Sequence, residues 1–544
     1  MNTLNKVLKF SGCFFVVAAF SCTKLDQKLN STLTSSQAAT ALGANGTQLL
    51  LQNAYNDLGA PYHELNQTFT LEEVTADQCV VPTRAGDWDD GGEWRDLKQH
   101  KFGANGTSHI SGQFNKLSKL NFDATNVLAF NPTKQQAAEA RFLRAISLYQ
   151  LLDLFGQFPF RNPGDNLLNA PKVLSGEEAV QFIISELTAA VTDLPSTSTP
   201  DKASKDAANF LLMRAYLNHG AFINRATPAY SDADMQKVIS LGNALIGSGK
   251  YSYSANYFDN FIINNSGSKE AIFNIPSTKE NYQSFHGRWM GTLHYNQYTP
   301  KNPGAGWNGF STVADFYNSF GINAIPTQTL ADSVLDGRIG QRFYKGVTDI
   351  SGVRPGLLIG QQFNENGVPL KDRTGLLLKF DPNIVADLKE KGPDLEIKGI
   401  RVIKYSPNYS NGGADYGGPT VGNLILFRYP DVVLMVAEAK MRATAADNAG
   451  ALVLINALRV ARQAAPLATI TLVNTTFIAD PKTLLAERGR ELYWESVRRT
   501  DLIRFGVFLK KWAYKEASDP KYLLFPIPPS ALASNPNLKQ NPGY

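Results

Sequence analysis

Long segments with helical spacing of apolar residues, joined in pairs by short turns, limit the fold most strongly. Residues 133–155 are apolar nearly all round, so we expect a central, buried helix that ends at Gly156. Residues 108–130 precede it, and Asn131 and Pro132 lie between the two segments. Because asparagine often caps a helix and proline often occupies its first turn, these two residues are expected to start the second helix. The two segments therefore predict an antiparallel helix pair.

Further segments continue this helical pattern. Helices are predicted at residues 47–58, 176–194, 203–222, 235–246, 429–444, 449–461 and 481–505. Paired helices of about 15 to 20 residues favour a tetratricopeptide-type array, in which each pair covers the apolar face of the next. Sequence similarity between the pairs is weak, since only AANFLLMRAYLNHG reads much like such a repeat. The prediction of an array therefore depends mainly on the layout.

The middle of the chain has a different character. From residue 251 to residue 426, glycine, proline, asparagine and aromatic residues become frequent, and the regular segments are short β-like runs. These runs are residues 271–275, 375–380, 399–405 and 423–427. We therefore predict a mostly α fold, a tetratricopeptide-like helix-pair superhelix with an inserted irregular lobe that contains short β-hairpins.

The amino-terminal residues indicate export. Lys6 and Lys9 precede an uncharged apolar run over residues 10–20, which suits a secretory signal. The run ends in Ala19, Phe20, Ser21 and Cys22, which is similar to the site at which bacterial lipoproteins are cleaved and lipidated. The alternative is a plain secretory signal with an incidental cysteine. Two or three acyl chains on Cys22 would hold the protein to a membrane almost permanently.

These features predict an order of segments. Residues 1–21 are a lipoprotein signal peptide and residues 22–36 a lipidated tether. Residues 37–250 are helical, with a binding loop near residues 80–100. Residues 251–426 form the irregular ligand-binding lobe, and residues 427–544 form a second helical part with an extended tail.

Composition argues against several classes of function. The formal net charge is +5, and removal of Lys6 and Lys9 with the signal leaves +3. Positive and negative charges are then nearly equal in number, which argues against binding to the phosphates of nucleic acid. The six histidines show no HExxH or similar spacing, so no metal centre or other cofactor is predicted. Cys13 belongs to the signal and Cys22 to the anchor, which leaves Cys79 without a partner for an intrachain disulfide.

Acidic residues on one predicted helix raise the question of catalysis. Glu487, Glu491 and Glu495 recur at intervals of four residues, and glycoside hydrolysis requires a pair of carboxyl groups. Arginines lie three or four residues from Glu487 or Glu495, and Asp501 lies three residues from two arginines. This spacing favours ion pairs on one helix, which keep the carboxylates ionised. The neighbours are Arg490, Arg498, Arg499, Asp501 and Arg504. We therefore interpret the cluster as structural, and we interpret Glu139, Arg141, Arg144, Asp153 and Glu438 in the same way.

Two loops combine aromatic and polar residues. A sugar ring has a face of C–H groups and an edge of hydroxyls, so its site requires Trp or Tyr faces with polar partners for the edge. Candidate ligand-binding residues are Arg84, Asp87, Trp88 and Trp94 in one loop, and Trp289, Tyr295, Trp307 and Asn308 in the other. The alternative is that each aromatic residue only anchors its loop.

The acids of the first loop invite a comparison with calcium sites. Asp87, Asp89, Asp90 and Glu93 lie among glycines, but the residue at position 12 counted from Asp87 is Lys98. An EF-hand requires a glutamate there. We therefore predict no metal site and expect a solvated loop or polar contacts to a ligand.

Five ordered motifs resemble signature stretches of the SusD/RagB family. They are RFLRAISLYQLLDLFGQFPF, FRYPDVVLMVAEA, INALRVAR, ERGRELYWESVRRTDLIRFG and FPIPPSALASNPNLKQNPGY. The family usually has Gly and His where Ser496 and Val497 stand, a difference that concerns packing more than function. The segments PTRAGDW and GWNGF are similar in position to ligand-contacting loops of the starch-binding member.

The resemblance implies a function as well as a fold. It implies a non-catalytic lipoprotein, anchored at the outer-membrane surface of a member of the Bacteroidetes, that binds oligosaccharides. It further implies a role as the lid of a SusC-like TonB-dependent transporter. Peptide uptake of the RagB kind is the nearest alternative; a lipid-anchored glycoside hydrolase and a scaffold that binds only proteins are more distant ones.

Overall fold

The computed structural model describes residues 45–277, 287–297, 306–321, 336–340, 355–364, 367–406 and 422–544. Contacts group Ala44–Tyr544 into one unit, which contains all of these residues. The predicted signal, tether and lipidated Cys22 lie outside the described residues. No helix within the described ranges is long and apolar enough to cross a membrane.

Helices dominate the described residues, which confirms the prediction of a mostly α fold. The helices of the amino-terminal half are α2 (Gly46–Asn56), α3 (Gly59–His63), η1 (Leu65–Val74), η2 (Asp90–Gly92), α4 (Glu93–Gln99), α5 (Ser108–Ala129), α6 (Lys134–Phe155), α7 (Gly176–Asp193), α8 (Lys205–Ile223) and α9 (Asp232–Gly247). Those of the remainder are η3 (Tyr257–Phe261), α10 (Gly287–Met290), α11 (Ala314–Asn318), η5 (Leu395–Ile397), α12 (Tyr429–Arg442), α13 (Asn448–Ala461), α14 (Leu484–Leu492), α15 (Arg498–Arg504), η6 (Pro520–Leu523) and α16 (Pro529–Ser534).

Helix α6 is the predicted central helix, and it is buried along nearly its whole length. Its cap differs from the prediction, because Thr133 rather than Asn131 starts the helix. The Thr133 hydroxyl accepts a hydrogen bond from the Gln136 backbone N–H, and the Gln136 side chain accepts one from the Thr133 N–H. This reciprocal pair satisfies two amides at once, which a cap at Asn131 would not do. Gly156 ends the helix at a φ of +72°, as expected.

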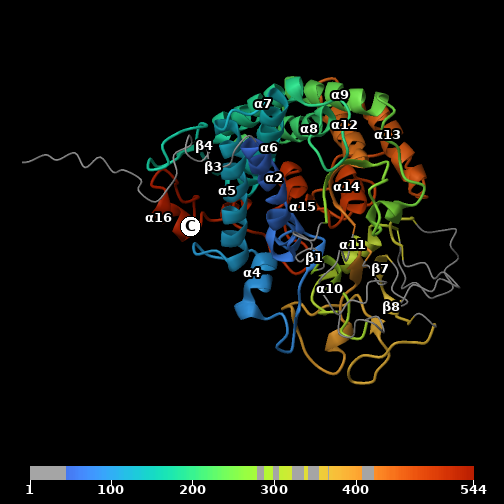
Figure 1. Cartoon of the computed structure of the whole chain (residues 1–544). Coiled ribbons are helices and arrows are strands. Elements are labelled where there is room, and N and C mark those ends of the chain that lie inside the picture. The colour runs from blue at the N-terminus through green and yellow to red at the C-terminus, as the bar shows by residue number, and fades with distance from the viewer. Residues whose placement is uncertain are drawn as a thin grey trace, which may run out of the picture. The chain divides into compact units, whose positions relative to one another are not determined.

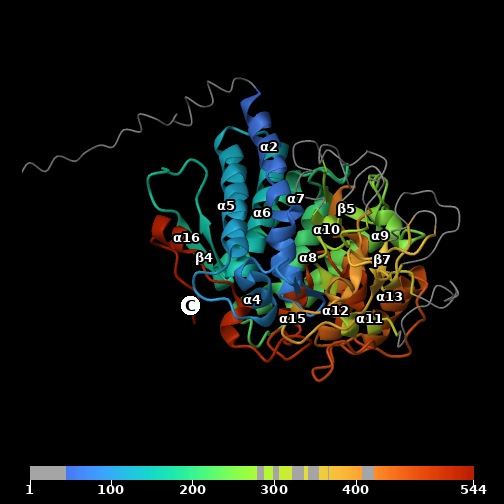
Figure 2. The same ribbon diagram turned by 90° about the horizontal axis from the view of Figure 1, so that it is seen from below.

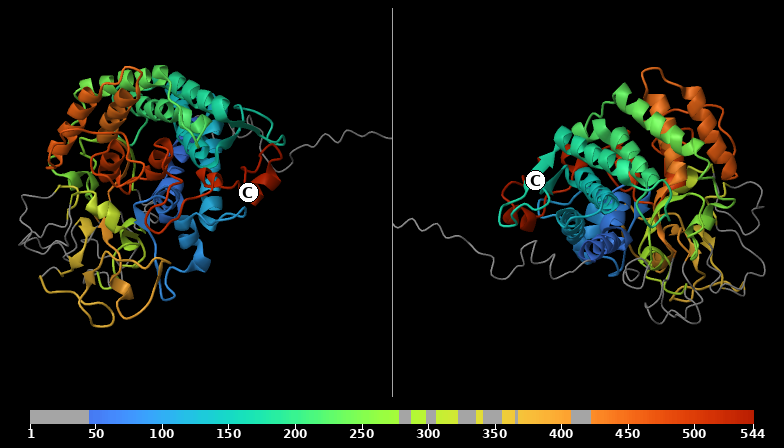
Figure 3. Two further views of the ribbon diagram at one scale, coloured as in Figure 1. Left: turned by 180° about the vertical axis from the view of Figure 1, so that it is seen from behind. Right: turned by 45° about the horizontal axis from the view of Figure 1, so that its top comes forward.

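Consecutive helices pack side by side. Helix α5 contacts α6, α6 contacts α7, α7 contacts α8, α8 contacts α9, α9 contacts α12 and α12 contacts α13. Figure 1 shows this succession as an arc of helices, and the left view of Figure 3 shows the same arc from behind. Seen from below, α2, α5, α6 and α7 lie nearly parallel (Figure 2). The tetratricopeptide-like superhelix remains an interpretation of this layout.

Strands in the described residues form small two-stranded sheets. The pairs are β1 (Cys79–Val80) with β6 (Ser311–Thr312), β2 (Thr83–Arg84) with β10 (Lys389–Glu390), β3 (Gln157–Phe160) with β4 (Lys172–Ser175), β5 (Ala271–Ile275) with β12 (Leu424–Arg428), β7 (Gly356–Leu358) with β11 (Arg401–Ile403), and β8 (Gly360–Gln361) with β9 (Lys379–Phe380). Only the β2–β10 pair is parallel. Most of these pairs join segments far apart in the sequence, so the irregular region is connected to the amino-terminal residues at β1 and β2.

The predicted helix over residues 481–505 is interrupted. Helix α14 ends at Leu492 and α15 begins at Arg498, and Trp494 and Ser496 between them adopt positive φ values of 60° and 62°. The Ser496 backbone N–H donates to the buried carboxylate of Glu73 at 2.8 Å. This region of φ favours glycine, so Ser496 adopts a conformation that is unusual for a residue with a side chain.

The stretch near residues 80–100, predicted as a loop, contains short elements instead. These are strands β1 and β2 and helices η2 and α4, and about half of the stretch is buried. Its short elements do not show the periodicity of a long helix, so the sequence pattern did not reveal them.

Candidate functional site

The two predicted binding loops lie against each other, and hydrogen bonds join candidate residues of one loop to candidate residues of the other in the described part of the chain. The Arg84 Nε donates to the Asn308 carbonyl at 2.8 Å. The Trp88 indole N–H donates to the Trp307 carbonyl at 2.7 Å, and the Tyr295 hydroxyl donates to the Asp87 carboxylate. The structure therefore brings together most of the residues that the sequence singled out.

Arg84 and Asn308 form the buried connection between these loops. Arg84 is 1% exposed, and its guanidinium also donates to the carbonyls of Leu395 and Lys398. Asn308 accepts from the guanidinium of Arg401 at 2.7 Å. Burial lowers the pKa of Arg84 to about 10, so the group stays protonated at neutral pH. Both predicted ligand residues are enclosed by protein in this structure, and they hold the loops in place.

Of the four predicted tryptophans, two are buried supports and two lie partly at the surface. Trp94 is 4% exposed and donates to Asp90 at 2.7 Å, and Trp289 is 6% exposed. Trp88 is half-buried and makes edge contacts with Trp94 and Phe310 at 5.5 Å between ring centroids. Trp94 and Trp289 are thus anchors, whereas Trp88, like Trp307, keeps part of its surface at the solvent.

Asp87, Tyr295 and Arg373 form an exposed group, which we call the Asp87–Tyr295–Arg373 cluster. The Arg373 guanidinium carbon lies 3.7 Å from the centroid of the Tyr295 ring, and one of its nitrogens lies 3.7 Å from an Asp87 oxygen. The side chains of Asp87 and Arg373 are 53% and 50% exposed. Burial, and then the bond to Asp87, raises the pKa of Tyr295, so its hydroxyl remains a donor. The cluster offers a carboxylate, a guanidinium and an aromatic ring to solvent at one point.

Buried groups fix the position of Arg373. The Arg373 Nε donates to Glu396 at 2.6 Å, and its backbone N–H donates to the same carboxylate at 3.2 Å. The His294 Nδ1 accepts from the Asn296 N–H at 3.0 Å, so its Nε2 carries the proton and donates to Glu396 at 2.9 Å. Burial opposes ionisation of Glu396, but the bonds from His294 and Arg373 lower its pKa to about 2. Glu396 is therefore a fixed anion that orients Arg373.

Sequence reasoning missed Arg373, His294 and Glu396. Arg373 lies in the sequence Asp372–Arg373–Thr374–Gly375, where the Asp372 carboxylate accepts from the Thr374 and Leu376 backbone N–H groups. An aspartate followed by a glycine three residues later is typical of a turn, so the turn itself could be predicted from the sequence. Nothing in the sequence shows that the turn packs on Tyr295, because the contact joins segments 78 residues apart.

The acids once compared with a calcium loop have protein partners. Asp89 accepts from Arg95 at 2.7 Å, Asp90 accepts from Trp94, and Glu93 accepts from the Ser108 hydroxyl at 2.9 Å. Within the described ranges, no three His, Cys, Asp or Glu side chains are grouped as metal ligands would be. The absence of a metal at this loop stays a prediction.

Comparison with known proteins connects the fold to a family. Residues 389–544 match the profile described as the SusD family. The "Starch-binding protein SusD" of Bacteroides thetaiotaomicron is 27% identical over 463 residues, which are 79% of this chain and 76% of that protein. These matches support the resemblance to the SusD/RagB family that the five sequence motifs indicated.

Solved structures of SusD-like proteins share the fold of this chain. A SusD superfamily protein from Bacteroides vulgatus has a TM-score of 0.66 at 18% identity, covering 92% of this chain and 99% of that one. The "Surface glycan-binding protein A" from Bacteroides uniformis has a TM-score of 0.65 at 18% identity, with 92% and 99% covered. SusD family proteins are non-catalytic binding proteins, which confirms the prediction that the chain is not an enzyme.

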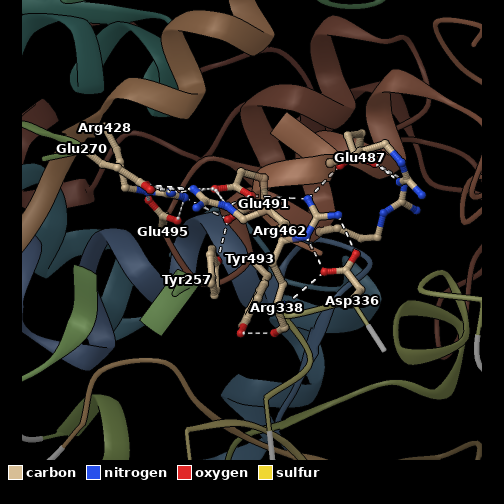
Figure 4. Close-up of polar contacts among 12 residues, drawn as sticks. Tyr257, Glu270, Asp336, Arg338, Arg428, Arg462, Glu487, Glu491, Tyr493 and Glu495 are labelled. Carbon is tan, nitrogen blue, oxygen red and sulfur yellow. Dashed lines mark hydrogen bonds and ion pairs between the residues drawn. The ribbon is translucent and has the colours of Figure 1, made fainter. Parts of the chain in front are cut away.

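The acids of α14 belong to a buried ion-pair network (Figure 4). Glu491 lies within 3.3 Å of guanidinium nitrogens of Arg338, Arg428 and Arg462. Glu487 pairs with Arg338 at 2.7 Å. Although burial opposes ionisation, these arginines lower the pKa of Glu491 to about 2 and hold that of Glu487 far below its ordinary value. A general acid needs a raised pKa, so the network is structural, as predicted.

The partners within the network differ in part from those predicted. Arg490 pairs with Glu487 at 2.5 Å and Arg504 with Asp501 at 2.6 Å, both at the predicted spacing. Arg498 instead pairs with Asp77. Most other partners of the predicted structural acids and bases also come from distant segments; Arg442, four residues after Glu438, is a local partner. Glu495 pairs with Lys404 and Arg428, Glu438 with Arg442 and Arg504, Arg141 and Arg144 with Glu186, Glu139 with the Tyr55 hydroxyl, and Asp153 with Thr500 and Arg499.

Proposed function

We propose that this protein is a non-catalytic, cell-surface glycan-binding lipoprotein, which captures oligosaccharides at the Asp87–Tyr295–Arg373 cluster. The observation that carries the proposal is this half-exposed group of a carboxylate, a guanidinium and an aromatic ring. Carboxylate and guanidinium groups form strong hydrogen bonds with the hydroxyl edge of a sugar, and aromatic rings pack on its C–H face. The names of the relatives, one starch-binding and one glycan-binding, support this choice of ligand.

Of the eight ligand-binding residues predicted from the sequence, four remain in the proposal: Asp87, Trp88, Tyr295 and Trp307. Arg373 joins them. The other four have buried side chains and are assigned a supporting role: Arg84, Trp94, Trp289 and Asn308.

The same proposal includes an anchor and a partner. Cys22 carries the lipid that holds the protein to the outer membrane, and the protein acts as the lid of a SusC-like TonB-dependent transporter. Support for this part comes from the lipoprotein-type sequence before Cys22 and from the family. In cells labelled with palmitate, the full chain is expected to take up label and Cys22→Ala to take up none; equal labelling would contradict the anchor.

Calorimetric titration tests the ligand class. The purified protein is titrated with oligomers of glucose, mannose, galactose and xylose, and with mixed tetrapeptides of matched length. We expect saturable binding of at least one oligosaccharide with no shortening of its chain. Binding of peptides alone would favour the RagB-like alternative, and a shortened glycan would indicate a hydrolase.

A further inference from the structure

A cavity of about 640 Å³ lies apart from the cluster described above. It is formed between the residues that follow α4, helix α11, the loop over residues 475–479 and the turn over residues 511–516. None of its lining residues belongs to the Asp87–Tyr295–Arg373 cluster or to the residues that support it. Its volume lies within the range of about 300–1,000 Å³ that is typical of small-molecule sites.

An exposed phenylalanine lines this cavity on a rigid loop. Phe477 is 53% exposed. The Asn474 side-chain oxygen accepts from the backbone N–H groups of Thr476 and Phe477 at 3.0 and 3.1 Å, and its nitrogen donates to Asp480 at 2.9 Å. The loop therefore holds an apolar ring with more than half of its surface at the solvent.

Two buried polar atoms of the lining residues lack a hydrogen-bond partner in the described part of the chain. They are the indole nitrogen of Trp512 and the side-chain oxygen of Gln78; Trp512 as a whole residue is half-buried, and Gln78 is 3% exposed. Buried donors and acceptors left without partners destabilise a protein by about 1–3 kcal/mol each, so such groups call for an explanation. A ligand with hydroxyl groups would supply an acceptor for the first and a donor for the second.

Charges around the cavity argue against an ionic ligand. Arg498 pairs with Asp77 at 2.7 Å, and Lys511 pairs with Glu516 at 2.8 Å. The Lys515 Nζ lies 3.9 Å from the centroid of the Trp512 ring and already donates to the Lys510 and Glu516 carbonyls and to the Ser518 hydroxyl. These cations are satisfied by protein groups, so the cavity does not concentrate charge of one sign.

We propose that this cavity is a second carbohydrate-binding site, which takes a neutral sugar unit between Phe477 and Trp512. The aromatic rings suit the C–H face of a sugar, and the unpartnered groups of Trp512 and Gln78 suit its hydroxyls. The site is independent of the proposed glycan site at the cluster, since the two share no residue.

Nuclear magnetic resonance of the indole N–H groups tests the second site. The chain has six tryptophans, so ¹⁵N-tryptophan labelling gives few signals, and Trp512→Phe identifies the one from Trp512. The probes are dimers to tetramers of glucose, mannose, galactose, xylose and N-acetylglucosamine, and tetrapeptides are tested for comparison. We expect at least one probe to shift the Trp512 signal saturably, and Phe477→Ala to weaken that binding at least tenfold.

Matched variants separate this site from the cluster. Phe122 on α5 is 39% exposed and does not line the cavity, so Phe122→Ala is expected to leave the titration unchanged. Arg373→Ala is also expected to leave the Trp512 titration unchanged, even if it removes binding at the cluster. Indole N–H signals of the other tryptophans that match those of the unmodified protein would show that Phe477→Ala is folded. The proposal is overturned if no sugar shifts the Trp512 signal, if only tetrapeptides shift it, or if the shift disappears in Arg373→Ala.

Discussion

Replacement of Glu491 by alanine is expected to lower the free energy of unfolding by about 3–5 kcal/mol. The Glu491 carboxylate is fully buried and accepts hydrogen bonds from Arg338, Arg428 and Arg462. Its removal leaves three buried guanidinium groups with fewer anionic partners, and the desolvation of a charge is then no longer compensated. Chemical denaturation followed by tryptophan fluorescence measures the change.

A surface ion pair provides the control for this substitution. Lys511 and Glu516 lie 2.8 Å apart with side chains 68% and 80% exposed, so Glu516→Gln is expected to change the free energy of unfolding by less than about 0.5 kcal/mol. Glu491→Gln keeps the volume of the side chain and is the milder variant if Glu491→Ala does not fold. A loss below about 1 kcal/mol for both Glu491 variants would contradict the structural role of the network.

Acid provides a second readout of the same network. The folded-state pKa of Glu491 and of Glu438 is about 2, below the ordinary value of 4.5. Groups with a lowered folded-state pKa stabilise the fold fully above their unfolded pKa, and this stabilisation is lost as the pH falls. The free energy of unfolding is therefore expected to decrease from about pH 4.5 towards pH 2, and less steeply in Glu491→Gln.

Replacement of Arg373 by alanine is expected to weaken oligosaccharide binding at the cluster tenfold to a hundredfold, which corresponds to about 1.4–2.8 kcal/mol. The guanidinium is half-exposed, but Glu396 and the Tyr295 ring hold it in one position. A donor that is already oriented loses little conformational freedom when a ligand binds. Calorimetric titration with the best oligosaccharide of the panel measures the dissociation constant.

Lys371 lies in the same segment and offers a matched control. It is exposed, and its backbone carbonyl, rather than its side chain, accepts a hydrogen bond from Asn296. Lys371→Ala removes a positive charge two residues from Arg373, yet it is expected to leave the dissociation constant within about twofold. Equal weakening by both substitutions would indicate a general charge effect rather than a specific contact.

The sequence predicted long, periodic elements well. The helices over residues 108–130 and 133–155 appear as α5 and α6 with ends within one residue, because their apolar pattern extends over many turns. The break between α14 and α15 was missed, because the left-handed residues Trp494 and Ser496 depend on contacts with distant segments such as Glu73. Local patterns do not encode contacts of this kind.

The candidate site could be predicted only in part. Residue types alone brought out Asp87 and Tyr295, since exposed loops rich in aromatic and acidic residues favour ligand binding. Arg84 and Trp94 have the same residue types as a ligand site requires, but they are buried in the structure. Their burial depends on how the two loops pack, which residue types do not reveal. Arg373 was missed for the same reason, because its role depends on a turn that packs on Tyr295 from a distant part of the chain.

The most direct test of glycan capture is a crystal structure of the protein with the oligosaccharide that binds it best. The account predicts electron density for a sugar ring in contact with the Tyr295 ring or Trp307, with hydroxyls within about 3.2 Å of Asp87 or Arg373. Saturated crystals with no sugar at the Asp87–Tyr295–Arg373 cluster, or with the sugar bound only elsewhere, would contradict it.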